Sequence, residues 1–427
     1  MTILSKKVFI TTLGCRLNQA DEALIYSRLS EIGYKPTTKE EKKDLIIVNT
    51  CTVTASAAQK SRQVFRKLKQ KNPFAKIAVT GCDVELNENF WKYECGCDFV
   101  IKSSEKHRIA EIISEKENAH RRQLINSEVF IENATAVFSF KNRALVKIQE
   151  GCNSFCAYCI VPFTRGKPRS RAFNEIIDEC KKLLEASHHE IVLTGVNICR
   201  YNDNGKDLSD LLYNILELNG DFRIRLSSTE PDAQLFKIIS LMKEKTKLCR
   251  FLHIPIQHGS DEILKLMRRH HNTDDFAEFA EFAVNKIDGI HLGTDFICGL
   301  PGETEELFEK SINFLKKLPL ANIHIFRYSP RIGTDAAKFP DRPANKDVFW
   351  RMKILEKLKE ELSLQFIKSQ VNKIATFIGE KKDNNMLIGW SDNYIKTIVK
   401  GSEQGKLTNI KFIKIMENKK LLAELIK

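Results

Sequence analysis

Three closely spaced cysteines constrain this chain more than any other feature. Cys152, Cys156 and Cys159 follow the pattern CxxxCxxC and come directly after an apolar stretch, Leu145 to Ile148, that we expect to form a strand. Three thiolates this close together suit three corners of a cubane [4Fe-4S] cluster. Since no fourth cysteine lies nearby in the sequence, one iron of such a cluster stays free to bind another ligand. The spacing therefore predicts a cluster that binds a substrate rather than one that only stores an electron.

An open iron can chelate S-adenosylmethionine (SAM) through its amino and carboxylate groups. An electron from the cluster then cleaves the sulfonium and yields a 5′-deoxyadenosyl radical. The pattern CxxxCxxC is the signature of radical SAM enzymes. A zinc site is the alternative interpretation, but tetrahedral structural zinc takes four ligands, usually from paired CxxC units.

The composition fits a globular protein with a large core. Hydrophobic residues make up 42% and charged residues 29% of the 427 residues, a length that suggests more than one domain. No apolar stretch approaches the roughly 18 residues that a membrane-spanning helix requires, and the first residues lack the apolar core of a secretory signal. Twelve cysteines are too dilute for a secreted disulfide scaffold. We therefore expect a cytoplasmic protein with no membrane partner.

The chain carries a formal net charge of +13, from 68 Lys and Arg against 55 Asp and Glu. Such a balance favours a polyanionic partner, of which nucleic acid is the leading candidate. Solvated lysine faces are the alternative explanation, and composition alone does not distinguish the two. The location of the charges has to decide between them.

The first part of the chain, residues 1–120, alternates apolar and amphipathic stretches as a parallel-sheet domain does. The predicted strands span residues 7–13, 44–49 and 76–80, and the predicted helices residues 21–32 and 55–71. Each strand runs into a cysteine, Cys15, Cys51 or Cys82, and Gly14 and Gly81 would supply tight turns. Neighbouring parallel strands end at one edge of a sheet, so we expect the three thiols to converge on a second cluster. One such cysteine alone would more often be a buried apolar residue.

Residues 135–368 are predicted to form a partial (β/α)6 barrel after a charged linker at residues 115–132. The six predicted strands span residues 145–148, 190–194, 222–227, 251–254, 290–297 and 323–328, and a long helix follows at residues 345–370. Active groups of such barrels lie at the carboxyl ends of the strands. Polar groups there, and a tyrosine between two triplet cysteines, are candidate cofactor contacts, although each could be an internally satisfied or packed side chain. They are Tyr158, Thr194, Gly195, Glu230, Gln257 and Asp295.

Basic residues gather in two places. Arg165, Lys167, Arg169 and Arg171 alternate on a loop just after the triplet, where they suit RNA phosphates. Salt bridges on a solvated loop are the alternative interpretation. Residues 369–427 contain short strand-like stretches at 374–378, 386–388, 394–399, 410–415 and 421–426, which indicate a small β-barrel. This segment is rich in lysines, including Lys396 and Lys400, as expected of a barrel that grips an RNA backbone.

Together these features resemble the methylthiotransferase family of radical SAM enzymes along nearly the whole chain. The resemblance implies a methylthiotransferase N-terminal domain, a radical SAM barrel and a C-terminal TRAM domain. Two stretches, Thr12 to Gln19 and Arg165 to Arg171, look most like the MtaB-type branch, which acts on N6-threonylcarbamoyladenosine next to the tRNA anticodon. His258 departs from the family pattern, in which a serine is expected, and Cys95 and Cys97 form an extra CxC that we interpret as structural.

The resemblance also implies the cofactors and the reaction. Cys15, Cys51 and Cys82 would ligate an auxiliary [4Fe-4S] cluster, and the triplet cysteines the radical SAM cluster. In the family, one SAM methylates sulfur held at the auxiliary cluster, and a second yields the radical that abstracts hydrogen from C2 of adenine. No side-chain acid or base is implied, because an unactivated aromatic C–H bond resists both. The implied partners are a tRNA anticodon stem-loop, an electron donor and a sulfur donor.

Three alternatives stay open on the sequence alone. The substrate could be tRNA carrying isopentenyladenosine, or it could be ribosomal protein S12, on which another branch of the family acts. The chain could also be an RNA-binding protein whose metal centres are purely structural. Cleavage of SAM would exclude this last alternative, and analysis of the substrate separates the other two.

Overall fold

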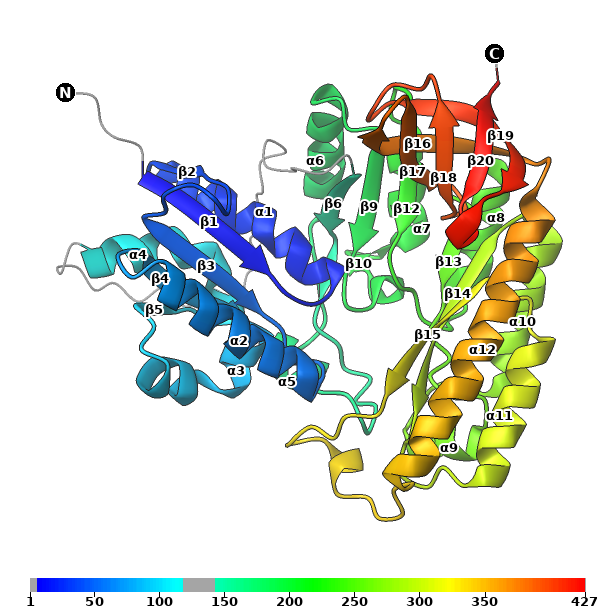
Figure 1. Cartoon of the computed structure of the whole chain (residues 1–427), viewed down its shortest axis with the longest axis horizontal. Helices are drawn as coiled ribbons and strands as arrows, with labels where there is room; N and C mark the ends of the chain where they lie inside the picture. Colours follow the sequence, from blue (N-terminus) through cyan, green and yellow to red (C-terminus); the bar gives the residue numbers. More distant parts are fainter. Residues whose placement is uncertain (1–5, 118–142, 427) are drawn as a thin grey trace.

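The computed structural model describes residues 6–117 and 143–426, which form three parts (Figure 1). Most of the predicted linker at residues 115–132 lies outside the described residues. A mixed α/β domain comes first, a half-open barrel of parallel strands follows, and a small closed β-barrel ends the chain. No helix in the described part of the chain is long and apolar enough to cross a membrane.

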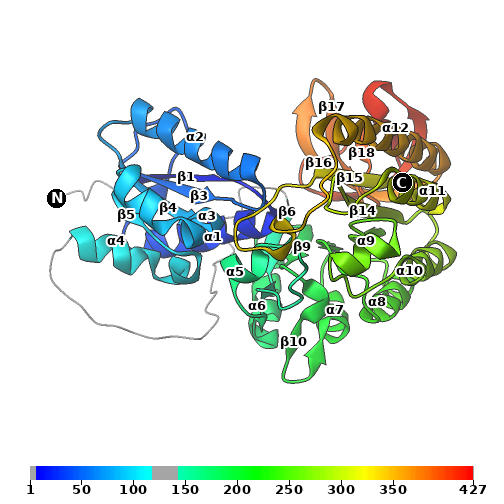
Figure 2. The same ribbon diagram turned by 90° about the horizontal axis from the view of Figure 1, so that it is seen from below.

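The first part is a five-stranded sheet with every neighbouring pair parallel, in the order β2-β1-β3-β4-β5. The central strand is buried at all six positions, because helices cover both faces of the sheet (Figure 2). The strands are β1 (Lys6–Thr12), β2 (Tyr34–Pro36), β3 (Leu45–Thr50), β4 (Lys76–Gly81) and β5 (Phe99–Val100). The helices are α1 (Arg16–Glu31), α2 (Ala55–Lys71), α3 (Cys82–Leu86) and α4 (Ile109–Glu117). The predicted parallel sheet is therefore confirmed, with two short edge strands added.

The second part is the predicted half-barrel. Its strands form two parallel sheets, β12-β9-β6 and β13-β14-β15, which isolated parallel bridges join between Ile224 and Leu248 and between Ser228 and His253. The strands are β6 (Arg143–Lys147), β9 (Glu190–Thr194), β12 (Arg223–Leu226), β13 (Phe251–His253), β14 (His291–Cys298) and β15 (Asn322–Arg327). The outer helices are α6 (Phe173–Glu185), α7 (Leu208–Leu216), α8 (Gln234–Glu244), α9 (Asp261–Leu266), α10 (Thr273–Lys286), α11 (Glu305–Lys317) and α12 (Asn345–Gln370). One continuous apolar core fills the space between these helices and strands.

The third part is a closed barrel of five strands in the order β16-β17-β18-β20-β19. Its small core is centred on Phe377 and Phe412, both fully buried. The strands are β16 (Ile374–Asp383), β17 (Met386–Ser391), β18 (Lys396–Lys400), β19 (Leu407–Ile415) and β20 (Leu421–Leu425). This confirms the small β-barrel expected for the C-terminal segment.

The small barrel is docked on the amino-terminal ends of the half-barrel strands through buried arginines. Glu190 accepts hydrogen bonds from Arg225 Nε at 2.8 Å and Arg223 Nε at 2.6 Å. The same guanidiniums reach across to the small barrel, where Arg225 Nη1 donates to the Asp392 carbonyl at 2.9 Å and Arg223 Nη2 to the Trp390 carbonyl at 2.9 Å. The carboxylate of Glu190 therefore orients the two arginines that hold these parts together.

Replacing Glu190 with glutamine should destabilise this junction. Burial opposes ionisation of Glu190, but Arg223 and Arg225 hold its pKa well below the usual range. Removing the carboxylate leaves two buried guanidiniums without their counter-ion, a loss of about 3 to 5 kcal/mol. Since the folded pKa is depressed, this stabilisation is present at neutral pH and is lost as the pH falls below about 4.3. Urea unfolding followed by tryptophan fluorescence should show a lower midpoint at pH 7.

The matched control for this experiment is Glu262→Gln, which removes the carboxylate of an exposed ion pair with Lys310 Nζ at 2.9 Å. Exposed pairs contribute about 1 kcal/mol or less. Equal midpoints for the two variants would contradict the role assigned to Glu190.

Candidate functional site

The three cysteines of the first domain lie at the same edge of its sheet. Cys15 follows β1 and precedes α1, Cys51 follows β3, and Cys82 begins α3 directly after β4. Because β1, β3 and β4 are adjacent parallel strands, their carboxyl ends bring the thiols together. Burial, with a further contribution from the neighbouring Cys82 and Cys15 thiols, raises the pKa of Cys51 to about 11. We call Cys15, Cys51 and Cys82 the auxiliary triad.

Two glycines let the backbone turn tightly around the auxiliary triad. Gly14 has a φ of +96°, and a Cβ added there would lie 2.7 Å from the sulfur of Cys51. Gly81 has a φ of +99°, and a Cβ there would lie 2.3 Å from the carbonyl oxygen of Thr50. At both positions a side chain is excluded because the positive φ disfavours it and because its Cβ would collide with neighbouring atoms. The two predicted glycine turns are therefore required by the way the cysteine loops pack against each other.

The second set of cysteines lies in one loop at the carboxyl-terminal side of the half-barrel. Cys152, Cys156 and Cys159, the SAM triad, lie between β7 (Gln149–Glu150) and α5 (Val161–Arg165). Backbone hydrogen bonds fix the loop: Cys152 N–H donates to the Gly166 carbonyl at 3.0 Å, and Cys159 N–H to the Cys156 carbonyl at 2.9 Å. Burial and the two neighbouring thiols raise the pKa of Cys159 to about 12. The three thiols therefore share one environment, as the ligands of a single cluster would.

The donor sets of the two triads fit iron–sulfur clusters. Each triad supplies three cysteine thiols, which lie at one sheet edge or within one loop. Structural zinc usually takes four ligands, whereas three thiolates can ligate three irons of a cubane, so the residues present fit a [4Fe-4S] cluster in each triad. A separate group of potential metal ligands in the described part of the chain is His253, Asp295 and His324, whose ligand atoms lie within 4.8 Å of one another.

A buried arginine connects the SAM triad to one of the predicted cofactor contacts. Arg269 Nη1 donates to the sulfur of Cys156 at 3.5 Å, and Arg269 Nη2 donates to the carboxylate of Glu230. Although burial raises the pKa of Cys156, the adjacent Arg269 opposes this by stabilising the thiolate. Arg269 was not identified from the sequence, where it is one of two consecutive arginines in a helix-terminal segment.

The remaining predicted cofactor contacts lie at or near the carboxyl ends of the half-barrel strands. Thr194 ends β9 and is buried, and Gly195 packs so closely that an added Cβ would lie 2.9 Å from the Gln149 carbonyl. Gln257 has a φ of +72°, and its N–H donates to the Asp295 carbonyl at 2.9 Å. Tyr158 is partly exposed within the SAM triad loop. The structure thus brings these residues to the side of the half-barrel that carries the triad.

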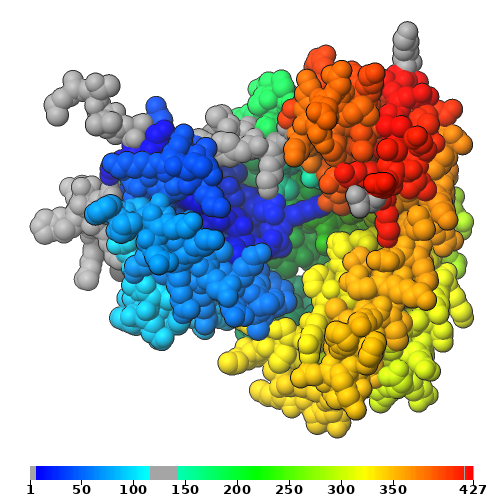
Figure 3. All heavy atoms as spheres, in the orientation of Figure 1, coloured from blue at the N-terminus to red at the C-terminus, as the bar shows by residue number. Residues whose placement is uncertain are grey.

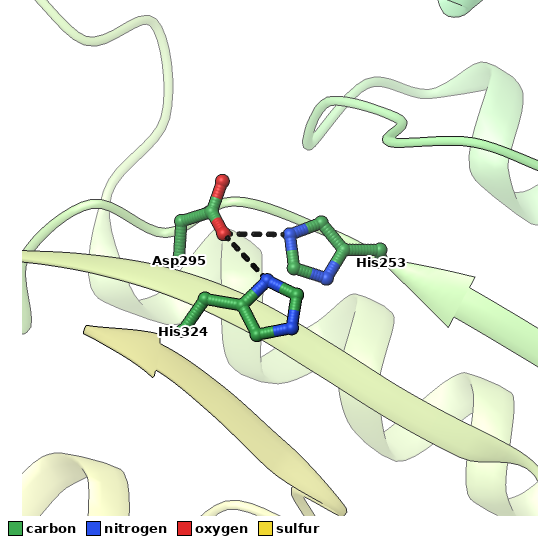
Figure 4. Close-up of side chains that lie close together, drawn as sticks. All are labelled: His253, Asp295 and His324. Carbon is green, nitrogen blue, oxygen red and sulfur yellow. Dashed lines mark hydrogen bonds and ion pairs between the residues drawn. The ribbon is translucent and has the colours of Figure 1, made fainter. Parts of the chain in front are cut away.

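Asp295 joins two stacked imidazoles on neighbouring strands (Figure 4). Its Oδ1 lies 2.8 Å from His253 Nε2 and 3.4 Å from His324 Nδ1, and the two ring centroids are 4.8 Å apart. Burial opposes ionisation of Asp295, but the hydrogen bonds from both histidines lower its pKa to about 2. Gly293 leaves room for His253, because a Cβ there would lie 2.9 Å from its Nδ1. His324 was not predicted as a site residue.

The basic loop after the SAM triad requires a correction. Arg165 and Arg171 were expected to contact RNA phosphates, but only 5% and 3% of their surfaces are exposed. Arg171 forms an ion pair with the carboxylate of Glu179, and Arg165 contacts Asp21, Glu150, Asn18 and Cys82. Both guanidiniums are therefore occupied within the protein. The other basic residues predicted to bind RNA keep part or most of their surface in solvent: Lys167, Arg169, Lys396 and Lys400.

A basic groove runs beside the auxiliary triad, where α2 and α3 of the first domain meet the segment after β15. It is lined by Arg62, Arg66 and Arg331 and by Ile332, which is 97% exposed. Arg331 Nη2 donates to the hydroxyl of Thr52 at 2.6 Å, next to Cys51. Figure 3 shows this junction between the blue first domain and the yellow segment, below a recess that the orange and red barrel borders. This groove could not be anticipated from the sequence, because its two sides are far apart along the chain.

Comparisons with known proteins agree with this geometry. Residues 146–315 match the radical SAM superfamily, and residues 7–102 match the uncharacterized protein family UPF0004. The chain is 34% identical over 420 residues to threonylcarbamoyladenosine tRNA methylthiotransferase MtaB of Bacillus subtilis, covering 94% of this chain and 93% of that protein. It is also 34% identical over 429 residues to tRNA-2-methylthio-N(6)-dimethylallyladenosine synthase of Aquifex aeolicus, covering 96% and 97%.

A solved structure shows the same fold at low identity. The radical S-adenosylmethionine methyltransferase TsrM of Kitasatospora setae superposes with a TM-score of 0.59 at 12% identity, over 78% of this chain and 77% of that protein. At this identity the likeness concerns the fold alone.

Proposed function

The chain belongs to the family of radical SAM tRNA methylthiotransferases, and from this premise we propose that it methylthiolates C2 of N6-threonylcarbamoyladenosine next to the 3′ side of the tRNA anticodon. The observation that supports this most directly is the pair of three-cysteine sites, one at the sheet edge of the first domain and one in the half-barrel loop. A reaction that needs both a radical and a sulfur source needs two such sites.

Overall identity does not select the nucleoside, since relatives that act on threonylcarbamoyladenosine and on dimethylallyladenosine are both 34% identical to the chain. The local pattern does favour the first. Residues 12–19 and 165–171 resemble the MtaB-type branch, and they surround the auxiliary triad and the end of α5. These segments lie next to the cysteines that would hold the clusters. Residues at this place would contact the nucleoside and could distinguish one substrate from the other.

When bound, the two clusters supply the electron that cleaves SAM and the place at which sulfur is methylated before its transfer. Cys152, Cys156 and Cys159 would hold one cluster, and Arg269 keeps Cys156 oriented through its hydrogen bond to the sulfur. The residues proposed to contact SAM lie around this loop and at the strand ends: Tyr158, Thr194, Gly195, Glu230, Gln257 and Asp295. No side-chain acid or base is assigned to the reacting carbon, because its C–H bond is broken by a radical.

The RNA is proposed to lie along basic surfaces that are at least partly exposed to solvent. The groove of Arg62, Arg66 and Arg331 borders Cys51 and suits the phosphates of an anticodon loop. Lys396 and Lys400 project from β18 of the C-terminal barrel, which we propose is a TRAM domain that grips the RNA backbone. A tRNA substrate places the enzyme in the cytoplasm, where an electron donor and a sulfur donor would complete the reaction.

A reconstitution assay tests the proposed function. The protein is purified without oxygen, loaded with iron and sulfide, and incubated with SAM, a reductant and tRNA carrying threonylcarbamoyladenosine. Mass spectrometry of the digested nucleosides should show that nucleoside with one hydrogen replaced by a methylthio group. The controls are tRNA carrying dimethylallyladenosine and ribosomal protein S12. Product on either control alone would replace the proposed substrate, and a failure to form 5′-deoxyadenosine with both clusters intact would contradict the enzymatic role itself.

A further inference from the structure

We propose that Arg165 is a positioning residue that ties the auxiliary triad to the SAM triad. The proposal rests on the cluster ligands assigned under the proposed function, but not on the identity of the RNA nucleoside. Arg165 is the last residue of α5, which begins two residues after Cys159 of the SAM triad. Its guanidinium reaches the first domain, so one short segment of the half-barrel contacts both cysteine sites.

The hydrogen bonds of Arg165 define this connection. Its Nε–H donates to the sulfur of Cys82 at 3.3 Å, and its Nη1 donates to Asp21 Oδ2 at 3.2 Å. Further donations go to the carboxylate of Glu150 and to the side-chain oxygen of Asn18. Every nitrogen of the guanidinium therefore has a partner in the protein, and one partner is a cluster ligand.

Asn18 extends the effect of Arg165 to the other two cysteine loops. The Asn18 Nδ2 donates to the carbonyl of Leu13 at 2.8 Å and to that of Thr50 at 2.9 Å. Thr50 directly precedes Cys51, and Leu13 precedes the Gly14 turn that leads to Cys15. By accepting from Arg165, the Asn18 side chain is held with its amide nitrogen towards both carbonyls. Arg165 thus contacts one ligand directly and supports the loops of the other two.

The carboxylates around Arg165 make its position rigid. Asp21 is fully buried and also pairs with Lys147 Nζ at 2.7 Å and with Lys106. Glu150, at the end of β7, pairs with Lys147 at 3.3 Å. Buried ions of this kind persist only where their partners are in place, so the network fixes the first domain against the half-barrel. The separation of the two triads is set at this network.

Two consequences follow for the cluster in the auxiliary triad. Hydrogen bonds to ligand sulfurs are among the factors that set the reduction potential of an iron–sulfur cluster, and a cationic donor favours the more reduced state. Loss of the Arg165 contact should therefore lower the midpoint potential of the auxiliary cluster. It should also loosen the cluster, since all three cysteine loops depend on the same guanidinium.

The test uses full-length variants loaded with iron and sulfide. Arg165→Lys keeps the charge but loses the forked donors, and Arg165→Gln loses the charge. Arg171→Gln is the matched control, because Arg171 is equally buried and ion-paired, but its guanidinium bonds Glu179 and the Lys147 carbonyl rather than a cysteine of either triad. Each substitution is also made in a chain with Cys152, Cys156 and Cys159 replaced by alanine, so that electron paramagnetic resonance reports the auxiliary cluster alone.

We expect both Arg165 variants to lower the midpoint potential of the auxiliary cluster or to reduce its iron content, and Arg171→Gln to leave both unchanged. With all six cysteines present, methylthio transfer should fall about 10- to 100-fold, as is typical when a residue behind a metal ligand is lost, while 5′-deoxyadenosine still forms. Asn18→Ala leaves the Arg165 contact with Cys82 in place but should also reduce the amount of iron that the auxiliary triad retains. This variant replaces the Arg165 variants in the test if they do not fold.

The proposal would be overturned if the midpoint potential and the iron content of the auxiliary cluster were the same in the Arg165 and Asn18 variants as in Arg171→Gln and in the chain without these substitutions. These readouts need no RNA. A wild-type protein that fails to modify tRNA therefore contradicts the proposed function without affecting this test.

Discussion

Replacing Cys152, Cys156 and Cys159 together with alanine is expected to abolish the formation of 5′-deoxyadenosine from SAM. These thiols are the only protein ligands assigned to the cluster that binds SAM, and no other cysteine shares their loop. Without them, neither the electron nor the coordination site for SAM is available. Chromatography of the reaction mixture should show no 5′-deoxyadenosine above background, and methylthio transfer should be lost with it.

The control for this variant is the iron that remains. The auxiliary triad should still bind one cluster, so the iron content is expected to fall by about half rather than to zero. Substantial cleavage of SAM by the triple variant would show that the radical is generated elsewhere, which would contradict the assignment of the SAM triad.

Replacing Cys15, Cys51 and Cys82 with alanine should separate the two halves of the reaction. The SAM triad is untouched in this variant, so 5′-deoxyadenosine should still form when a reductant is present. Methylthio transfer should disappear, because the proposed place for the sulfur is gone. Measuring both products in one reaction tests the division of labour between the triads directly.

Cys95 and Cys97 provide the matched control in the same domain. Both are partly buried thiols that pack against an apolar cluster that contains Trp91, and neither follows the carboxyl end of β1, β3 or β4 directly. Burial raises the pKa of Cys97 to about 12, with a further contribution from Cys95. Replacing both with alanine should leave the iron content and methylthio transfer near wild-type values. If iron content and methylthio transfer fell equally in this control and in the auxiliary triad variant, the assignment of the auxiliary triad as the cluster site would be contradicted.

Long, strongly patterned elements of the fold were predictable from the sequence. Helix α2 was expected at residues 55–71 and has these bounds, and β3 was expected one residue before its observed position. The edge strand β2 was missed because it has three residues and ends in Pro36, too short for a period to show. The order of the strands was not predicted, but parallel strands share one edge at their carboxyl ends, which is why the convergence of the auxiliary triad could be anticipated.

The errors cluster around the site itself. Helix α1 was expected to begin near Asp21 but begins at Arg16, because Asn18 and Asp21 are polar residues on its buried face and hide the apolar period. The same two residues are the partners of Arg165, which explains why that arginine was expected on an exposed loop. A charged side chain is buried only where partners compensate its charge, and here those partners are distant in sequence. Their position next to Arg165 follows from the fold and not from the local sequence pattern.

The hydrogen bond between Arg165 and Cys82 bears on the order of events during synthesis. The two residues are separated by 83 positions, so the last cysteine of the auxiliary triad leaves the ribosome well before its guanidinium partner is made. The strands β1, β3 and β4 can pair in the meantime, since all three precede residue 82. The sheet that carries the auxiliary thiols is thus complete early, whereas the buried ion network around them closes only after the chain has passed through the SAM triad. A nascent chain stalled before residue 165 would hold the three thiols without the contact that orders them.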